Sequence, residues 1–232
     1  ERTIVSYETD LREFEEYFQE VDAGLDFKKI DADIVRRWMV QLMDEGRAAT
    51  SVNRKLSTLR SFYRFLLRRK EVVINPMLKV VGPKKKKPLP FFVREKDMDR
   101  LLDESLFEEG FEGCRDRLIL EMFYATGMRL SELIGLNDAD VDLSARLIKV
   151  TGKRNKQRLI PFGNEMEEDL LIYIKVRNET LPEGTKAFFV RKNGMRMYPL
   201  QVYRLVRKSL SKVVTLKKRS PHVLRHTFAT AM

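Results

Sequence analysis

The stretch RLIKVTGKRNKQRLIPF, residues 146–162, decides the fold class of this 232-residue chain. Its two ends, RLIKV and QRLIPF, are short aliphatic runs of the kind found in strands. Gly152 and Asn155 lie between them and favour a tight turn, so the stretch predicts a β-hairpin. Because helical periodicity dominates the rest of the chain, we predict a mainly α fold with a small antiparallel β-sheet (α+β).

Amphipathic helix patterns surround this hairpin on both sides. The first third of the chain predicts three helices: one in SYETDLREFEEYF, one between an Asp31 cap and Gly46, and one from about Thr50. Further helices are predicted at 95–104, 115–125, 130–136, 165–179, about 199–213 and from Ser220 onward. The stretch AFFVRKNGMRM predicts a second hairpin that turns at Asn193 and Gly194.

The composition points to a polyanionic partner. Lys and Arg number 45 against 34 Asp and Glu, which gives a formal net charge of +11. This excess favours double-stranded DNA as the partner, with solubility through net charge as the plainer alternative. The single cysteine, Cys114, cannot form an internal disulfide, which favours a reducing cytoplasm. With DNA as the partner, we expect a cytoplasmic, nucleoid-associated protein. No apolar run approaches the roughly twenty residues that cross a bilayer, so no membrane partner is expected.

The third predicted helix carries a basic face opposite its apolar side. Six cations lie on that face: Arg54, Lys55, Arg60, Arg64, Arg68 and Arg69. Almost no acidic residue interrupts them, so we take Arg54, Lys55 and Arg60 as candidate contacts to DNA phosphates. A solvated face of a helical bundle is the alternative.

A basic, proline-rich segment separates two expected domains. The prolines of residues 83–90, PKKKKPLP, exclude a regular helix. We interpret the segment as a stiff linker between a helical domain at 1–82 and a second domain at 91–232. Its four lysines are candidate DNA contacts: Lys84, Lys85, Lys86 and Lys87. A basic linker between two basic domains suits a clamp that closes around a duplex.

Two stretches of the second domain carry candidate cations of a functional site. ATGMRLSELIGL places Arg129 at a helix start, with Glu132 one turn further on and able to orient the guanidinium. Lys153 lies at the base of the hairpin turn, and Lys156 in the same turn is a candidate DNA contact. Taken singly, each is ordinary, because surface ion pairs and turn lysines are common.

The stretch HVLRH adds two more donors at the start of the last helix. His222 and Arg225 share one face of its first two turns, where free backbone N–H groups already favour an anion. His222 and His226 have the spacing of a zinc helix, but Val223 takes the place of the zincin glutamate and no further histidine is present.

The four candidates Arg129, Lys153, His222 and Arg225 are all hydrogen-bond donors. Two arginines can grip the non-bridging oxygens of a phosphoryl transition state, and a lysine or histidine can protonate the leaving oxygen. A metal-dependent nuclease instead needs grouped carboxylates, which the stretches near Lys153 and His222 lack. We therefore expect no metal and no cofactor.

Together, ATGMRLSEL, TGKRNKQRLIP and SPHVLRHTFAT resemble the catalytic domain of the tyrosine recombinases, the phage integrase family, with the Xer group as the nearest match. SVNRKLSTLRSFYRFL followed by NPM resembles the SAM-like core-binding domain of the same proteins. The similarity covers nearly the whole chain, in three ordered motifs.

The resemblance implies a role for each candidate. Arg129 and Arg225 match the two catalytic arginines, Lys153 the general acid and His222 the histidine of the HxxR motif. Glu132 matches a supporting acidic residue, and His226 is expected to be a buried structural histidine. The family rejoins DNA through a 3′-phosphotyrosyl link without metal or ATP, as four protomers on two sites. An accessory or translocase protein is a further possible partner.

The resemblance also implies that the nucleophilic tyrosine lies beyond residue 232. We expect the seven tyrosines present to be core residues: Tyr7, Tyr17, Tyr63, Tyr124, Tyr173, Tyr198 and Tyr203. The last helix has no stop signal, and the chain starts without Met, so we expect trimming at both ends. The chain as given should bind DNA without cleaving it. The alternative is a non-catalytic DNA-binding protein on a recombinase scaffold.

Overall fold

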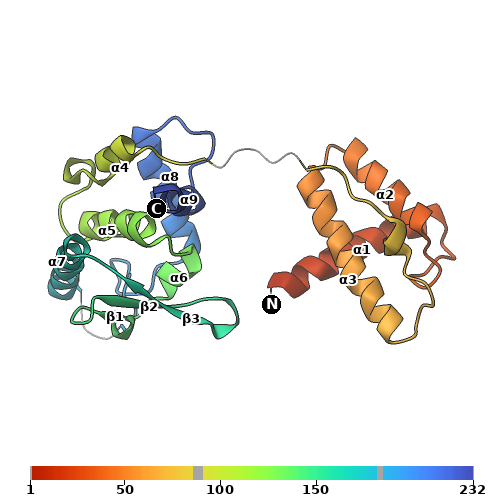
Figure 1. Ribbon diagram of the computed structural model, residues 1–232, viewed down its shortest axis with the longest axis horizontal. Helices are drawn as coiled ribbons and strands as arrows, with labels where there is room; N and C mark the ends of the chain where they lie inside the picture. Colours follow the sequence, from red (N-terminus) through yellow and green to blue (C-terminus); the bar gives the residue numbers. More distant parts are fainter. Residues whose placement is uncertain (1, 86–90, 182–184, 232) are drawn as a thin grey trace. The chain divides into compact units, whose positions relative to one another are not determined.

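The computed structural model describes residues 2–85, 91–181 and 185–231, which form two compact units, Glu1–Pro88 and Leu89–Met232 (Figure 1). Within the described ranges, no helix combines the length and hydrophobicity that spanning a membrane requires. The predicted class, mainly α with a small antiparallel sheet, is confirmed.

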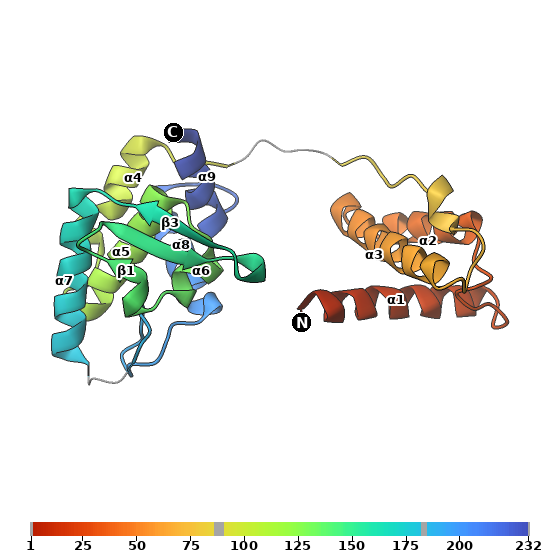
Figure 2. The same cartoon turned by 60° about the horizontal axis from the view of Figure 1, so that its bottom comes forward.

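The first unit is a three-helix bundle. It comprises α1 (Arg2–Val21), α2 (Ala32–Asp44), α3 (Ala49–Arg68) and the short 3-10 helix η1 (Pro76–Lys79) (Figure 2). The Asp31 side chain accepts the N–H groups of Asp33 and Ile34 and so caps α2 as predicted. An aromatic cluster fills the core, with the Phe14 and Trp38 ring centroids 4.8 Å apart.

The second unit is built around α5 (Phe111–Thr126). This helix packs against four others, which are α4 (Glu95–Leu102), α7 (Asn164–Thr180), α8 (Pro199–Val213) and α9 (Pro221–Ala231). Its buried side chains face several directions, because neighbours surround it. The short α6 (Leu130–Gly135) follows α5 after a sharp corner and packs against the sheet.

The sheet contains the predicted hairpin and one strand more. Strands β1 (Val141–Asp142), β2 (Leu147–Thr151) and β3 (Gln157–Pro161) pair antiparallel in the order β1-β2-β3. Within the hairpin Thr151 pairs with Gln157, so residues 152–156 form its loop, which includes the 3-10 turn η4 (Lys153–Asn155). Two more 3-10 turns, η2 (Glu104–Leu106) and η3 (Asp138–Asp140), complete the unit.

The second predicted hairpin is reduced to a turn. Arg191 N–H donates to Met195 O at 2.8 Å, and Val190 and Arg196 form an isolated antiparallel bridge, but no strand forms there. Phe188 and Phe189 are buried in the core, and Arg196 donates to the carbonyl oxygens of α6 and the residue after it. Packing on neighbouring helices therefore replaces the ladder that the alternation predicted.

The expectation that the tyrosines are core residues is correct for only two of them. Tyr63 and Tyr173 are fully buried, and their hydroxyls donate to backbone carbonyls. Tyr17 and Tyr124 are half-buried, and three others are exposed: Tyr7, Tyr198 and Tyr203. Each exposed tyrosine lies in or next to the first two turns of its helix.

Candidate phosphate-binding site

The corner between α5 and α6 carries the first candidate arginine. Gly127 ends α5 in the left-handed region, at φ 55° and ψ 24°, and donates its N–H to Phe123 O at 3.1 Å. A Cβ at this position would be strained and would collide with the ring of Phe228. Arg129 follows at the N-cap of α6, and its side chain is 55% exposed.

Glu132, one turn into α6, is the buried centre of this corner. Its side chain is 0% exposed, and its Oε1 accepts the Arg129 Nη1 group at 2.8 Å. Its Oε2 accepts the backbone N–H of Arg129, also at 2.8 Å, which is half of a capping box. The predicted pairing of Arg129 with Glu132 is therefore present.

The ionisation of Glu132 is fixed by these contacts. Burial raises the pKa of the carboxyl, but hydrogen bonds from Arg158 and from the backbone and side chain of Arg129 outweigh burial and hold the pKa at about 2. The group is therefore a carboxylate at neutral pH, and it fixes the position of the Arg129 guanidinium.

Arg225 reaches the same corner from α9. Its Nη1 donates to Gly127 O, two residues before Arg129. Helix α9 packs along α5, and the ring of Phe228 lies against Gly127. Two helices that are far apart in the sequence thus hold both arginines at one backbone turn.

The two histidines of α9 lie on its outer side. His222, one turn before Arg225, is exposed. The expectation of a buried His226 is wrong, because it is also exposed. Leu224 and Thr227 take the inner positions instead, and Thr227 Oγ1 accepts the N–H of Val93 at 2.9 Å.

Lys153 lies on the hairpin loop next to this corner. A Cβ on Gly152 would lie 3.3 Å from Glu132 Oε1, so the base of the hairpin lies against the buried carboxylate. Gly152 N–H donates to Lys156 O at 2.7 Å and closes the loop. Lys153 and Lys156 are exposed, and neither side chain pairs with a described residue.

Arg158 on β3 is a member of this site that sequence reasoning missed. Its Nη1 and Nη2 donate to Glu132 Oε1 and Oε2 at 2.8 and 2.9 Å. A signal was available, because Glu132 stands beside the apolar Leu133 and Ile134 and a buried carboxylate needs cationic partners. Nothing in the sequence names the partner, which lies 26 positions away.

The outer face of α8 was also missed. It carries exposed cations at helical spacing: Arg204, Arg207 and Lys208. Val202 and Val206 are buried on the opposite face. The i, i+3, i+4 repeat of the cations would have identified this face.

The candidate DNA contacts of the first unit fall into different environments. The expectation that Lys55 faces outward is wrong, because its side chain is 6% exposed and pairs with Asp10 and Glu13. Arg54 also pairs with Asp10, and Arg60 donates to Val80 O at 3.0 Å. All three therefore have partners on other segments, which periodicity does not reveal, but only Lys55 is buried, whereas Arg54 is exposed and Arg60 is half-buried.

The predicted linker is described only in part. Lys84 and Lys85 are exposed, whereas Lys86 and Lys87 lie outside the described residues. The Asn53 side chain donates to Pro83 O at 2.9 Å, so the start of the linker is attached to α3.

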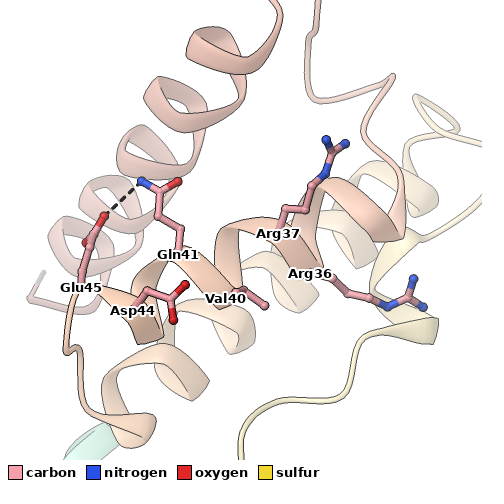
Figure 3. A pocket seen from close by; sticks show the side chains of 6 residues that line it. All are labelled: Arg36, Arg37, Val40, Gln41, Asp44 and Glu45. Atoms are coloured by element: carbon pink, nitrogen blue, oxygen red, sulfur yellow. Dashed lines mark hydrogen bonds between the residues drawn. The ribbon is translucent and has the colours of Figure 1, made fainter.

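A shallow hollow on α2 is separate from these residues (Figure 3). It lies along a single helix and is lined by Arg36, Arg37, Val40, Gln41, Asp44 and Glu45. Gln41 donates to Glu45 Oε1 at 3.1 Å. Cations occupy one end and carboxylates the other, and the hollow shares no residue with the site in the second unit.

The corner is therefore a candidate anion-binding site, at which the hydrogen-bond donors Arg129 and Arg225 are attached to one turn of an α+β domain. In the described ranges, no group of three His, Cys, Asp or Glu side chains could hold a metal ion. The guanidinium groups of Arg129 and Arg225 at this corner suit a phosphate rather than a metal.

Comparison with known families agrees with this chemistry. Residues 92–232 match the Phage integrase family, and residues 1–70 match the "Phage integrase, N-terminal SAM-like domain". The first match alone covers more than half of the chain. The chain belongs to the phage integrase family, the tyrosine recombinases, and the resemblance seen in its motifs is confirmed.

Similar curated proteins are Xer recombinases. Tyrosine recombinase XerC of Chlorobaculum tepidum is 38% identical, with 100% of this chain and 76% of the relative covered. Tyrosine recombinase XerC of Staphylococcus carnosus is 36% identical, with 99% and 77% covered.

Solved structures share the fold. The XerH site-specific recombinase bound to palindromic difH substrate gives a TM-score of 0.81 at 21% identity, over 98% of this chain and 68% of that one. A lambda integrase dimer bound to a COC′ core site gives 0.71 at 18% identity, over 99% and 63%.

Proposed function

We propose that this protein binds duplex DNA and acts in site-specific recombination, with the corner between α5 and α6 holding the phosphate that is cut. The observation that carries the proposal is the attachment of Arg129 and Arg225 to one turn, through Glu132 and Gly127 O. Each guanidinium has five N–H donors, and these contacts leave several for an anion.

The net charge and the names of relatives support DNA as the partner. The formal charge of +11 attracts a polyanion. The curated relatives are named tyrosine recombinases, and two solved structures of the same fold are described as DNA complexes. Exposed cations in both units, including Lys85, Lys156 and Arg204, would extend the contact along the DNA backbone.

The proposed chemistry is phosphoryl transfer in two steps. A tyrosine oxygen attacks the phosphorus, the bond to the 5′-oxygen breaks, and a 3′-phosphotyrosyl link forms. Arg129 and Arg225 would hold the two non-bridging oxygens as negative charge develops on them. Lys153 would give its proton to the leaving 5′-oxygen, and His222 would donate a further hydrogen bond. The reverse attack by a 5′-hydroxyl rejoins the strand.

For the 232 residues alone we propose DNA binding without cleavage. The resemblance implies a nucleophile that follows the HxxR motif, whereas all seven tyrosines precede His222. Tyr63 and Tyr173 are in addition fully buried, with their hydroxyls donating to Phe27 O and Phe188 O. Strand exchange would further require other protomers, four on two sites, and an accessory protein is compatible with this arrangement.

A nicked suicide duplex incubated with the complete protein tests the proposal. We expect a covalent protein–DNA adduct, and we expect Arg129→Ala and Arg225→Ala each to reduce its rate about 10³-fold while DNA binding persists. An adduct that forms at the normal rate in either variant contradicts the role of that arginine. Binding without any adduct from the unsubstituted protein would favour a DNA-binding protein on a recombinase scaffold.

A further inference from the structure

The Glu132 carboxylate accepts four hydrogen bonds, and two of them come from a residue without an assigned role. Arg158 donates through both terminal nitrogens, at 2.8 and 2.9 Å, whereas the Arg129 side chain donates through Nη1 alone. The remaining donor is the backbone N–H of Arg129. Arg158 therefore makes the bidentate, geometrically defined contact of the pair.

The charges of the three side chains do not cancel. Glu132 contributes one negative charge, and Arg129 and Arg158 contribute two positive charges, which leaves a net charge of +1. Without Arg158 the buried carboxylate would neutralise Arg129, and of the corner's two arginines only Arg225 would keep an uncompensated charge for an anion. Glu132 itself is 0% exposed, so water cannot screen it directly.

Arg158 also joins two elements of the site. It lies on β3 opposite Val150 of β2, at the base of the loop that carries Lys153. Its contact with Glu132 connects this hairpin to α6, which carries Arg129. The close approach of Gly152 to Glu132 Oε1 lies at the same junction.

We propose that Arg158 is a positioning residue that acts through Glu132. It offsets the buried carboxylate so that Arg129 keeps its positive charge for the phosphate, and it holds the Lys153 hairpin against α6. This inference rests on the proposed function, because it assigns Arg158 a part in the same reaction.

A direct DNA contact is the competing explanation, since the Arg158 side chain is 41% exposed. The two explanations differ in what a second substitution does. Arg158→Gln leaves Glu132 facing Arg129 alone, whereas Arg158→Gln with Glu132→Gln restores the net charge of +1. If Arg158 acts through Glu132, the second substitution should restore part of the lost rate. If Arg158 contacts DNA directly, the second substitution should restore none of it.

The test measures adduct formation by the complete protein on a nicked suicide duplex at saturating DNA. It compares Arg158→Gln, Glu132→Gln and the double variant with the unsubstituted protein. We expect Arg158→Gln to slow the reaction about 100-fold, and the double variant to recover about tenfold or more. Lys192→Gln is the matched control. Lys192 also pairs with a carboxylate, that of Glu112, but its own side chain is 77% exposed. This control should change the rate less than about twofold.

A pH profile supplies a readout that a merely structural role would not move. The charged groups facing Glu132 are Arg129 from its own helix and Arg158 from β3, and the hairpin loop adds the backbone at Gly152. In Arg158→Gln only the two hydrogen bonds from Arg129 still oppose burial, so the pKa of Glu132 should rise, and the rate should rise as the pH falls and the carboxylate is protonated. The double variant should lack this rise.

The outcomes separate the two proposals. An unsubstituted protein that forms no adduct overturns the proposed function, and the Glu132 pKa measured by NMR in the 232-residue chain then still tests the contact. A normal adduct rate in the unsubstituted protein, with a double variant no faster than Arg158→Gln and no change in the pH profile, overturns the role of Arg158.

Discussion

Each unit contains a buried carboxylate held by two cations, and the two clusters differ in what they leave exposed. In the first unit, Asp10 is 1% exposed and pairs with Arg54 and Lys55, and Glu13 adds a second negative charge. Two positive and two negative charges cancel, and Lys55 is itself buried. This cluster joins α1 to α3 and presents no net charge.

The Glu132 cluster of the second unit has the opposite balance. One carboxylate meets two arginines whose side chains are 55% and 41% exposed. A buried carboxylate can therefore pair with cations that serve only to join helices, or it can orient cations that remain available to an anion. The charge balance distinguishes the two cases: Arg54 is 49% exposed, much like Arg129 and Arg158, but Glu13 supplies a second carboxylate in the first cluster.

The largest expected difference concerns stability. Asp10→Asn leaves the buried Lys55 with only Glu13, so we expect the free energy of unfolding to fall by about 3 kcal/mol. Glu132→Gln leaves two exposed arginines that water can solvate, so we expect a loss of about 1 kcal/mol. Urea unfolding followed by the fluorescence of Trp38, the single tryptophan of the chain, measures the first unit.

The control for this comparison is Glu8→Gln. Glu8 pairs with Arg12 at 2.9 Å on a helix surface where both side chains are more than 60% exposed. Its removal should change stability by less than about 0.5 kcal/mol. Equal losses for Asp10→Asn and Glu8→Gln would contradict the distinction between the clusters.

The next largest effect on stability concerns Gly127, at the corner that Arg225 contacts. Gly127→Ala combines a positive φ with a collision against Phe228, so we expect the second unit to lose about 2 kcal/mol or more. Gly194→Ala is the control, because Gly194 has a φ of +74° and nothing within 4 Å of an added Cβ. It should lose about 1 kcal/mol from backbone strain alone. Equal losses, measured by circular dichroism during urea unfolding, would show that Phe228 adapts.

A smaller effect separates buried from exposed cations in DNA binding. Lys85→Gln should weaken the affinity of the 232-residue chain a few-fold and reduce the slope of log affinity against log salt by about 0.9. Lys55→Met should leave that slope unchanged, because its ammonium does not reach solvent. A fluorescence-anisotropy titration at several salt concentrations measures both. A reduced slope in Lys55→Met would contradict the burial of this lysine.

The last effect concerns Glu121, a carboxyl that forms no ion pair with a described residue although the charge of Arg117 acts on it. Burial, and then the hydrogen bond and charge of Asp169, raise the pKa of Glu121 to about 8, and its buried Oε2 has no partner among the described residues. The folded state therefore keeps a proton that the unfolded chain loses above about pH 4.3, so stability falls as the pH rises towards 8. Glu121→Gln should remove this fall and therefore raise the Tm by several degrees more at pH 8 than at pH 5. A difference in Tm between Glu121→Gln and the unsubstituted protein that is the same at pH 5 and pH 8 would contradict the raised pKa of Glu121.

Local sequence signals predicted most of the fold. Asp31, Gly46 and the aliphatic runs around Gly152 act within a few residues of themselves, so the helix starts and the hairpin could be placed. Long-range pairing could not be placed, since Lys55 is buried by partners on α1 and Arg158 is recruited by a carboxylate on α6. The two-residue strand β1 gives no periodic signal at all.

The candidate site shows the same division. The motifs identified Arg129, Glu132 and Arg225, because each lies in a short stretch with its own capping or helix-start chemistry. His226 was misplaced, since the choice of which side of α9 faces α5 depends on packing by Leu224 and Thr227. Periodicity gives the spacing of a buried face but leaves its rotation to tertiary contacts.

The most direct measurement is the structure of the 232-residue chain bound to a duplex recombination site. The account predicts that guanidinium nitrogens of Arg129 and Arg225 lie about 2.7–2.9 Å from two oxygens of the same DNA phosphate, with Lys153 and His222 beside it. Arginines bound to different phosphates, or turned away from the DNA, would contradict it.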